Sequence, residues 1–337
     1  MNDSAVASSD FPGTRFQVRR RVWYALALVC AVVAVMVGGL VYHFGGRIAL
    51  IRAIEQQGGW VDTERVVTGV PREMAGNRII HYFEKPIGVS YEAMAVGNRQ
   101  LAPLGQLREL EYVGLNQSRI SGDSLRHVAD LSTLESVSMW QSNVGDDGLV
   151  HLAKLERLRN LFLSGSNITG DGLAHIAHLV NLERLWLSNT AVDDESLMHL
   201  GQLVELQTLT LGQTNVRGPG LRHIGGLSNL EYLNLSQTQI DSTSLPALRG
   251  SRSLSALDLS GTQIDDRNLA VFVRLPQLRS LNLSETSVSD AAIPTLQRLD
   301  LLHYLGLKGT RVTEPGYQQL QQKLTDCDVH WEPAAVE

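Results

Sequence analysis

The sequence predicts an α/β protein that forms a right-handed solenoid, with a parallel β-sheet on its concave side and short helices on its convex side. Three observations support this prediction. A phrase of 24 residues repeats without an insertion from Leu110 to Leu302. Each copy begins with apolar residues that alternate with a period of two, as in a half-buried strand. Each copy ends with apolar residues three apart, as in a short helix, and a fixed period of this size indicates stacked repeats with right-handed crossovers.

Every copy begins with a leucine and carries further apolar residues three and five positions later. The opening leucines are Leu110, Leu134, Leu158, Leu182, Leu206, Leu230, Leu254, Leu278 and Leu302. One copy alone cannot bury its apolar residues, so neighbouring copies must stack and their strands must join one sheet. Between strand and helix stands a short polar residue that can cap the free N–H groups of the helix. These residues are Ser121, Thr169, Asp193, Asp241, Asp265, Ser289 and Thr313.

The phrase L-x-x-L-x-L-x-x-(S/T)-x-(I/V) resembles the repeat of leucine-rich-repeat proteins. That family usually has asparagine at the ninth place of the phrase, where its side chain bonds to neighbouring turns. This chain has a hydroxyl residue there, which bonds to turn backbone more weakly. The residues are Ser118, Ser142, Ser166, Thr190, Thr214, Thr238, Thr262, Thr286 and Thr310. In this respect the chain is similar to the short T-x-(V/I)-T-D-x-x-L repeats of many bacterial proteins, and the resemblance implies a binding solenoid.

The 24-residue register continues beyond both ends of these copies. Counting forward gives Val329 and Trp331, a closing strand whose large indole can cover the open end of the stack. Counting back gives a divergent first repeat with apolar residues at Val89, Tyr91, Val96, Leu101, Leu104 and Leu107. Terminal repeats are atypical because they cap the core. The sequence therefore predicts a leucine-rich-repeat domain over residues 86–332, with about ten repeats and the closing strand, followed by a tail over 333–337.

Residues 22–46 contain no residue that is charged at neutral pH. A helix of this length, at ~1.5 Å per residue, exceeds the ~30 Å hydrocarbon core of a bilayer. We therefore predict an uncleaved signal-anchor helix over 22–46. The alternative is a cleaved signal peptide, but an apolar core of such a peptide is usually only ~7–15 residues long, and no A-x-A site follows this segment.

Positive charge is distributed unequally around the predicted membrane helix. Four arginines precede it at Arg15, Arg19, Arg20 and Arg21, whereas only Arg47 and Arg52 follow closely. The positive-inside rule then makes residues 1–21 a cytoplasmic basic tail and places the repeats on the non-cytoplasmic side, in a bacterial periplasm. Residues 47–85 are predicted to form a juxtamembrane helix over 47–57 and an irregular N-terminal cap with strand-like stretches at Val66-Val67 and Ile79-Ile80.

Charge and cysteine content exclude several classes of function. The first 52 residues carry a net charge of +4, so the remainder carries −10 of the chain's total of −6. An acidic repeat domain without a basic stripe argues against binding to nucleic acid. The two cysteines, Cys30 and Cys327, cannot meet, so no disulfide framework is expected. Animal and plant members of the family that are secreted usually have cysteine-rich caps, and their absence favours a bacterial envelope protein. Neither a metal nor a cofactor is expected.

Two further sequence patterns resemble catalytic or metal-binding motifs, but both follow from the repeat itself. Gly122-Asp123-Ser124-Leu125 spells the motif of a lipase and esterase family, yet Asp147-Gly148-Leu149 and Asp171-Gly172-Leu173 fill the same place in later repeats. A catalytic reading of Ser124 is therefore the weakest hypothesis, and the sequence predicts no enzyme. One histidine also recurs in five successive repeats, at His127, His151, His175, His199 and His223. Metal binding by this row is disfavoured, because all ligands must lie ~2.0–2.1 Å from one ion and the helices of adjacent repeats are too far apart for that. A role of these histidines as a pH sensor is the second hypothesis. The favoured explanation is that repeat duplication copied a tolerated, half-exposed residue.

Side chains at the third, fifth and seventh places of each phrase point out of the concave side of the sheet. Most are small or polar, such as Ser188, Ser260 and Ser284. Against this background stand five aromatic residues and one arginine, which we take as the candidate partner-binding residues. They are Tyr112, Trp140, Phe162, Arg184, Trp186 and Tyr232. Clustered exposed aromatics with an arginine are typical of interface hot spots; the alternative is that the rings stack on each other or cover the N-terminal cap.

These observations predict a membrane-anchored recognition protein that binds another protein through its concave face. A module that binds an envelope glycan is the second hypothesis, because aromatic faces beside serine and asparagine ladders also suit sugars. A membrane-anchored hydrolase that uses Ser124 is the third.

Overall fold

The computed structural model describes residues 28–35, 45–65, 84–120 and 122–333. The chain divides into two compact units, residues 1–52 with 69–83 and residues 53–68 with 84–337. Residues 28–35 and 45–56 are helical. The predicted basic tail over 1–21, and the predicted membrane helix apart from residues 28–35, 45 and 46, lie outside the described residues. Within the described part of the chain, no helix is both long enough and apolar enough to cross a membrane.

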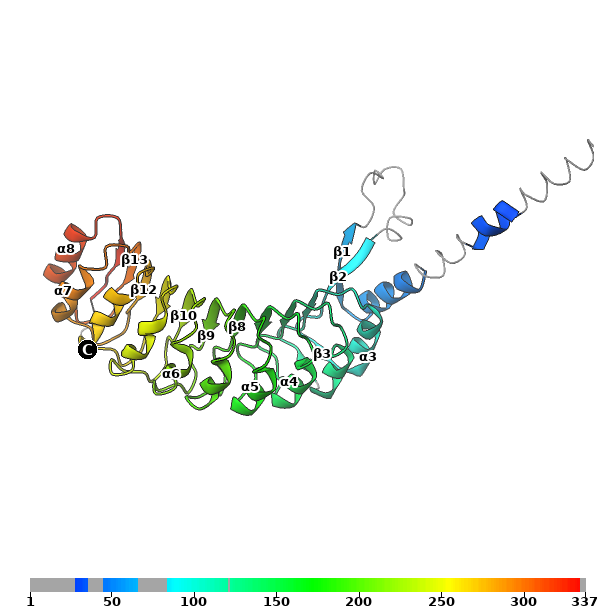
Figure 1. Cartoon of the computed structure of the whole chain (residues 1–337), viewed down its shortest axis with the longest axis horizontal. Helices are drawn as coiled ribbons and strands as arrows, with labels where there is room; N and C mark the ends of the chain where they lie inside the picture. The colour runs from blue at the N-terminus through cyan, green and yellow to red at the C-terminus, as the bar shows by residue number, and fades with distance from the viewer. Residues whose placement is uncertain (1–27, 36–44, 66–83, 121, 334–337) are drawn as a thin grey trace, which may run out of the picture. The chain divides into compact units, whose positions relative to one another are not determined.

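The second unit is a solenoid with one strand in each repeat. Twelve described strands form one sheet in the order β1-β2-β4-β6-β7-β8-β9-β10-β11-β12-β13-β14. In the repeats these are β4 (Tyr112–Gly114), β6 (Ser136–Ser138), β7 (Asn160–Phe162), β8 (Arg184–Trp186), β9 (Thr208–Thr210), β10 (Tyr232–Asn234), β11 (Ala256–Asp258), β12 (Ser280–Asn282), β13 (Tyr304–Gly306) and β14 (Asp328–His330). Neighbouring repeat strands are parallel and offset by 24 residues, as with Leu209 beside Leu185. The strands line the inner side of this unit and the helices its outer side (Figure 1).

The outer side is formed by short α-helices and short 3-10 helices. The α-helices are α3 (Asn98–Leu101), α4 (Asp146–Leu152), α5 (Gly170–Ile176), α6 (Leu221–Ile224), α7 (Ile293–Leu296) and α8 (Glu314–Lys323). The 3-10 turns are η2 (Ala102–Gln106), η3 (Gly122–His127), η4 (Ser196–Leu200), η5 (Leu245–Gly250), η6 (Leu269–Arg274) and η7 (Asp290–Ala292). The leucines of both halves of each repeat are buried between strand and helix and form one continuous core.

The capping residues act as the sequence predicted. Thr169 Oγ1 accepts a hydrogen bond from the Asp171 N–H at 3.2 Å, and Asp241 Oδ1 accepts one from the Thr243 N–H at 2.9 Å. Equivalent bonds occur at Asp193, Asp265, Ser289 and Thr313, whereas Ser121 lies outside the described residues. Each bond supplies an acceptor for an N–H group that the start of a helix leaves free.

The hydroxyl that replaces the usual asparagine bonds within its own turn. Thr214 Oγ1 donates to the carbonyl oxygen of Leu211 at 2.6 Å, and Thr190, Thr238 and Thr286 make the same bond. The residue just before it adopts a left-handed backbone, as in Gln213 with φ of 56°. Its N–H then donates to Ser236 O in the next repeat at 2.8 Å. The ladder between repeats therefore continues past the end of each strand.

Carboxylates tie neighbouring repeats together on the helix side. Asp266 Oδ1 accepts from the Ser289 N–H at 2.8 Å, and its Oδ2 accepts from the Ser289 hydroxyl at 2.7 Å. We call this pair of bonds the aspartate latch. Asp146 and Asp290 make the same latch to the threonine 23 residues ahead, and Asp194 accepts three backbone N–H groups of the next repeat. A β-carbon at Gly172 would collide with the Asp146 carboxylate, so that glycine is required by the close approach of the two repeats.

The N-terminal end of the sheet is more regular than the sequence predicted. β1 (Trp60–Arg65) pairs antiparallel with β2 (Glu84–Ser90), and β2 pairs parallel with β4. Two short strands, β3 (Ala95–Val96) and β5 (Arg119–Ile120), form a separate pair. Tyr91 of the divergent first repeat is fully buried and donates to Gln100 O at 3.0 Å, and its burial raises the pKa of Tyr91 to about 12. The strand-like stretches at Val66-Val67 and Ile79-Ile80 lie outside the described residues.

The C-terminal end is closed by aromatic stacking. β14 pairs with β13 in the 24-residue register, as Val329 beside Leu305. The Trp331 indole stacks on the Tyr317 ring of α8, with centroids 5.1 Å apart and an interplanar angle of 15°. Its Nε1 donates to Val312 O at 2.9 Å, so the polar end of the ring is also satisfied.

Candidate functional site

The concave face is formed by alternate residues of the repeat strands. In β8 the burial pattern is exposed, buried, exposed, so Arg184 and Trp186 point outward on either side of a core leucine. The register places β7 and β9 on its two sides and aligns the outward residues in two rows across the three strands. One row is Asn160–Arg184–Thr208 and the other is Phe162–Trp186–Thr210. We call these six residues the aromatic grid.

Phe162 and Trp186 form a ring pair within this grid. Their centroids lie 4.7 Å apart and their planes are inclined by 73°, which is an edge-to-face arrangement. Such a pair stabilises by ~0.5–1.5 kcal/mol beyond the area it buries. Phe162 is half-buried, but 41% of Trp186 remains exposed. The ring pair therefore contributes to the packing of Phe162 and leaves part of the Trp186 side chain open to solvent or to a partner.

Arg184 carries a charge that its neighbours do not neutralise. Its Nη1 donates to Asn160 Oδ1 at 3.0 Å, and the acceptor is a neutral amide. The nearest carboxylate along the chain, Glu183, is paired with Arg159. Within the described residues Arg184 forms no ion pair, and its side chain is exposed. A guanidinium in this state keeps most of its donors available for a planar acceptor such as a carboxylate.

The two threonines of the grid also have unused hydrogen-bonding capacity. Thr210 is only 9% exposed, and its hydroxyl is buried without a hydrogen-bond partner. Thr208 is half-buried, and its hydroxyl forms no hydrogen bond within the part of the chain that the structure describes. A buried hydroxyl without a partner costs ~1–3 kcal/mol. Burial keeps the Thr210 hydroxyl out of reach of a ligand, so of these two residues only Thr208 can offer its hydroxyl to a partner.

The remaining predicted residues lie outside the grid, but two of them border it: Tyr232 is the register partner of Thr208, and Trp140 follows β6, which pairs with β7. Tyr112 lies on β4, and its ring packs over the sheet backbone, since a β-carbon at Gly114 would collide with its hydroxyl. This agrees with the alternative that some rings cover the N-terminal end. Trp140 follows β6 and its backbone N–H donates to Asn116 Oδ1 at 3.3 Å. Tyr232 lies on β10, two strands from Trp186, and its hydroxyl accepts from the Asn234 amide at 3.4 Å.

The polar ladder beyond the grid is bonded within itself. Ser236 and Ser260 donate to Asn234 Oδ1 and Asp258 Oδ1 respectively, each at 2.7 Å. Backbone N–H groups of the same two serines donate to the same oxygens. These side chains stabilise the turn after each strand, which leaves them with less capacity to bind a ligand. The sequence pattern alone did not reveal this role, although Asx residues two positions before serine are its signal.

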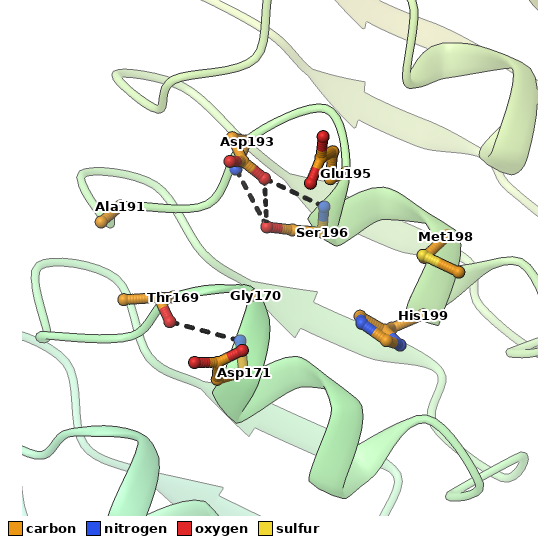
Figure 2. Close-up of a pocket in the computed structure, with 9 residues that line it drawn as sticks. All are labelled: Thr169, Gly170, Asp171, Ala191, Asp193, Glu195, Ser196, Met198 and His199. Atoms are coloured by element: carbon orange, nitrogen blue, oxygen red, sulfur yellow. Dashed lines mark hydrogen bonds between the residues drawn. The ribbon is translucent and has the colours of Figure 1, made fainter.

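A cavity of about 300 Å³ lies at the N-terminal ends of α5 and η4 (Figure 2). Its walls include Asp171, Asp193, Ser196, Met198 and His199. Three of its polar side chains, those of Thr169, Asp193 and Ser196, are engaged in helix capping. The Asp193 carboxylate accepts from the Ser196 hydroxyl at 2.6 Å and from its N–H at 3.0 Å, and these bonds lower the pKa of Asp193. Capping thus accounts for part of the polar lining of this cavity, and the concave face is the site considered further.

The structure gives no support to catalysis at Ser124. The side chain is 1% exposed, and among the described residues its hydroxyl has no hydrogen-bond partner and no base placed to activate it. His127, three residues away, bonds instead to Asn98 Oδ1 at 3.2 Å. The five histidines of the row are exposed or half-exposed along the helix side. Among the described residues no group of three or more acidic, histidine or cysteine side chains is arranged to hold a metal ion.

Comparison with known proteins identifies the architecture. Residues 204–264, which include β9, β10 and β11, match the sequence profile described as Leucine rich repeat. The fold is similar to that of an internalin (inlF) from Listeria monocytogenes, with a TM-score of 0.53 and 18% identity, over 73% of this chain and 82% of that one. Internalin C2 of the same organism gives a TM-score of 0.50 and 23% identity, over 63% and 84%. No curated protein is similar in sequence to this chain. The second unit thus has the fold of a leucine-rich-repeat solenoid.

Proposed function

We propose that this protein recognises another protein through the concave face of its leucine-rich-repeat solenoid and does not act as an enzyme. The observation that carries this proposal is the exposed indole of Trp186 beside Phe162 and the unpaired guanidinium of Arg184. Tryptophan and arginine are the residues most often found at interface hot spots. Solenoids of this kind offer long surfaces that suit such binding.

The proposal includes anchoring to a membrane by residues 22–46. It rests on the uncharged run in the sequence and on the four arginines that precede it. With the N-terminus in the cytoplasm, the repeats lie on the non-cytoplasmic side, in the periplasm of a bacterium. A protein anchored there binds partners of the cell envelope.

A glycan of the envelope is the second candidate for the ligand. The observation that favours it is the exposed aromatic face of Trp186 beside short polar side chains, an arrangement that also suits a sugar ring. The internal bonding of Ser236 and Ser260 weakens this alternative, because the hydroxyls that would contact a sugar are already used.

Substitution in the grid tests the proposal. Trp186→Ala and Arg184→Ala are expected to weaken capture of the native partner about thirty-fold or more each, since hot-spot residues contribute ~2 kcal/mol or more. The measurement is quantitative cross-linking of the full-length protein in its native cells, followed by titration against the identified partner. Arg184 is exposed, so the melting temperature of Arg184→Ala should change little, whereas Trp186→Ala also loses the ring pair with Phe162 and should melt slightly lower than the wild type.

Two control variants match these changes. Tyr304→Ala removes a half-buried ring from the same sheet near its C-terminal end, and Ser260→Ala shortens the polar ladder. Both should leave capture within a few-fold of the wild type. Normal binding by Trp186→Ala together with a large loss in Ser260→Ala would show that the polar ladder is the recognition surface and would favour the glycan.

A further inference from the structure

We propose that the aromatic grid binds an acidic side chain and a bulky apolar side chain that stand two positions apart in an extended segment of the partner polypeptide. This inference rests on the proposed function and specifies the chemistry of its ligand. It names Arg184 as the group that receives the carboxylate and Trp186, with Phe162, as the group that receives the apolar side chain.

The two rows of the grid differ in chemistry. Asn160, Arg184 and Thr208 form a row of hydrogen-bonding groups with one positive charge. Phe162 and Trp186 form an apolar surface in the other row. Arg184 and Trp186 are separated by two residues of one strand, which corresponds to ~6.6 Å. The side chains of residues i and i+2 in any extended polypeptide face the same way with this same spacing, so a partner strand aligned with β8 meets both rows at once.

The positive charge of Arg184 favours a negatively charged side chain of the partner at the polar row. Within the strands from β4 to β13, Arg184 is the one lysine or arginine at an outward position of the described residues. Lys308, at the seventh place of its phrase, follows β13 and is paired with Glu332. The opposite charge closest along the chain, Glu183, is held by Arg159. The residue equivalent to Glu183 in the next repeat, 24 positions further on, is the neutral Gln207. A carboxylate of the partner placed beside Arg184 can therefore pair with a guanidinium that has no other counter-ion and still has N–H donors free. It can also accept a hydrogen bond from the Thr208 hydroxyl.

The apolar row exposes aromatic surface that a partner could cover. Trp186 is 41% exposed, although its neighbour Thr210 is almost fully buried. A bulky aliphatic or aromatic side chain laid on the open indole face removes apolar surface from water. Such a contact excludes water from the neighbouring ion pair, and this strengthens the charge-assisted hydrogen bonds.

Selection from a random-peptide display library on immobilised full-length protein tests the inference. The wild type is expected to enrich peptides with Asp or Glu two positions from Trp, Phe, Leu or Ile. Arg184→Gln should lose the acidic preference and keep the apolar one, whereas Trp186→Ala should lose the apolar preference. Arg279→Gln is the matched control, because it removes an exposed arginine from the strand side of the same solenoid outside the grid.

Titration of one enriched peptide then measures the charge contribution. Replacing its acid by the corresponding amide should weaken binding to the wild type about tenfold or more, and should change binding to Arg184→Gln very little. Arg184→Lys should recover part of the affinity, because lysine keeps the charge but loses the planar fork. High salt should weaken the wild-type complex more than the Arg184→Gln complex.

The outcomes separate this inference from the proposed function. Enrichment of apolar peptides that depends on Trp186 but not on Arg184 would overturn the inference and leave the proposed function standing. No enrichment above that of Trp186→Ala would overturn both. Binding of an acidic polysaccharide that depends on Arg184, without any peptide motif, would replace the polypeptide by an anionic glycan.

Discussion

Leu209 illustrates how the core depends on single residues. It is fully buried on β9, and the register places it between Leu185 and Leu233 of the adjacent strands. Leu209→Ala removes side-chain volume from a stack that cannot collapse around the gap, because the ladders on both sides fix the strand spacing. We expect a loss of ~2–5 kcal/mol in the free energy of unfolding, measured by urea denaturation.

The control for Leu209 is Val204→Ala, which shortens an exposed apolar side chain at the end of the preceding repeat. It should change the free energy of unfolding by less than ~0.5 kcal/mol. Because neighbouring repeats share interfaces, the Leu209→Ala protein should also show increased amide exchange in the repeats on either side. A midpoint close to that of the wild type would contradict the assigned register.

At the residue scale, the period of the sequence was enough to predict which side chains point outward. It placed Phe162, Arg184 and Trp186 on the concave face and on neighbouring strands, which the register confirms. It could not predict that Tyr112 lies over the sheet backbone at Gly114. That contact depends on how one ring turns relative to a glycine on its own strand, which repeat periodicity does not encode.

At the scale of the repeat, the aspartate latch is expected to hold helix-side turns together. Asp266→Ala removes both acceptors from Ser289 and leaves its N–H without that bond. We expect a loss of ~1–3 kcal/mol in the free energy of unfolding, because these bonds involve a charged acceptor. Asp266→Asn should recover part of the loss, since its amide oxygen can still accept from the Ser289 N–H. Asp300→Ala, an exposed aspartate outside any latch, is the control and should be close to neutral.

Acid should weaken the turns that begin the helices. A hydrogen bond from the Arg267 side chain is the largest effect that lowers the pKa of Asp265, to about 2, and the Thr243 hydroxyl lowers the pKa of Asp241 in the same way. Carboxylates with lowered pKa contribute stability that is complete above their unfolded pKa of ~3.9 and is lost as the pH falls toward the folded value.

Thermal melting between neutral pH and about pH 2 tests this expectation. The melting temperature should fall below about pH 4, and the fall should be smaller in Asp265→Asn than in the wild type. Arg267 is largely exposed, so high salt should reduce the difference between the two proteins. An equal fall in both proteins would show that the Asp265 carboxylate contributes nothing.

The elements themselves were predicted unevenly. Strand, turn and helix follow from one repeated phrase, and the capping residues were identified because their chemistry is local. The latch was missed, although Asp146, Asp194, Asp266 and Asp290 stand at multiples of 24 residues. A carboxylate that bonds to the next repeat and one that caps its own helix look alike in sequence. The regular pairing of β1 with β2 was also missed, because a single hairpin has no second copy to reveal its register.

At the scale of the whole molecule, each repeat of the solenoid is stabilised by contacts with the repeats on either side. The first and last repeats have only one such neighbour, so each end of the core must be covered in its own way. At one end β2 continues the parallel sheet and Tyr91 fills the space behind it. At the other, Trp331 stacks on Tyr317. Both ends use large rings where the interior uses leucine, because a terminal repeat has only one neighbour and must cover the exposed core with its own side chains.

The distribution of charge along the chain makes a prediction about membrane topology. The arginine-rich residues 1–21 precede the uncharged residues 22–46, and the acidic repeats follow. The positive-inside rule then requires the repeats to be outside the cytoplasm. Protease added to intact bacterial spheroplasts should digest the repeats and spare residues 1–21, as detected with a tag at each end. Replacing Arg19, Arg20 and Arg21 by glutamine should increase the fraction of protected repeats. Full protection in the wild type would contradict the topology, and a mature N-terminus beyond residue 30 would show that the segment is cleaved as a signal peptide.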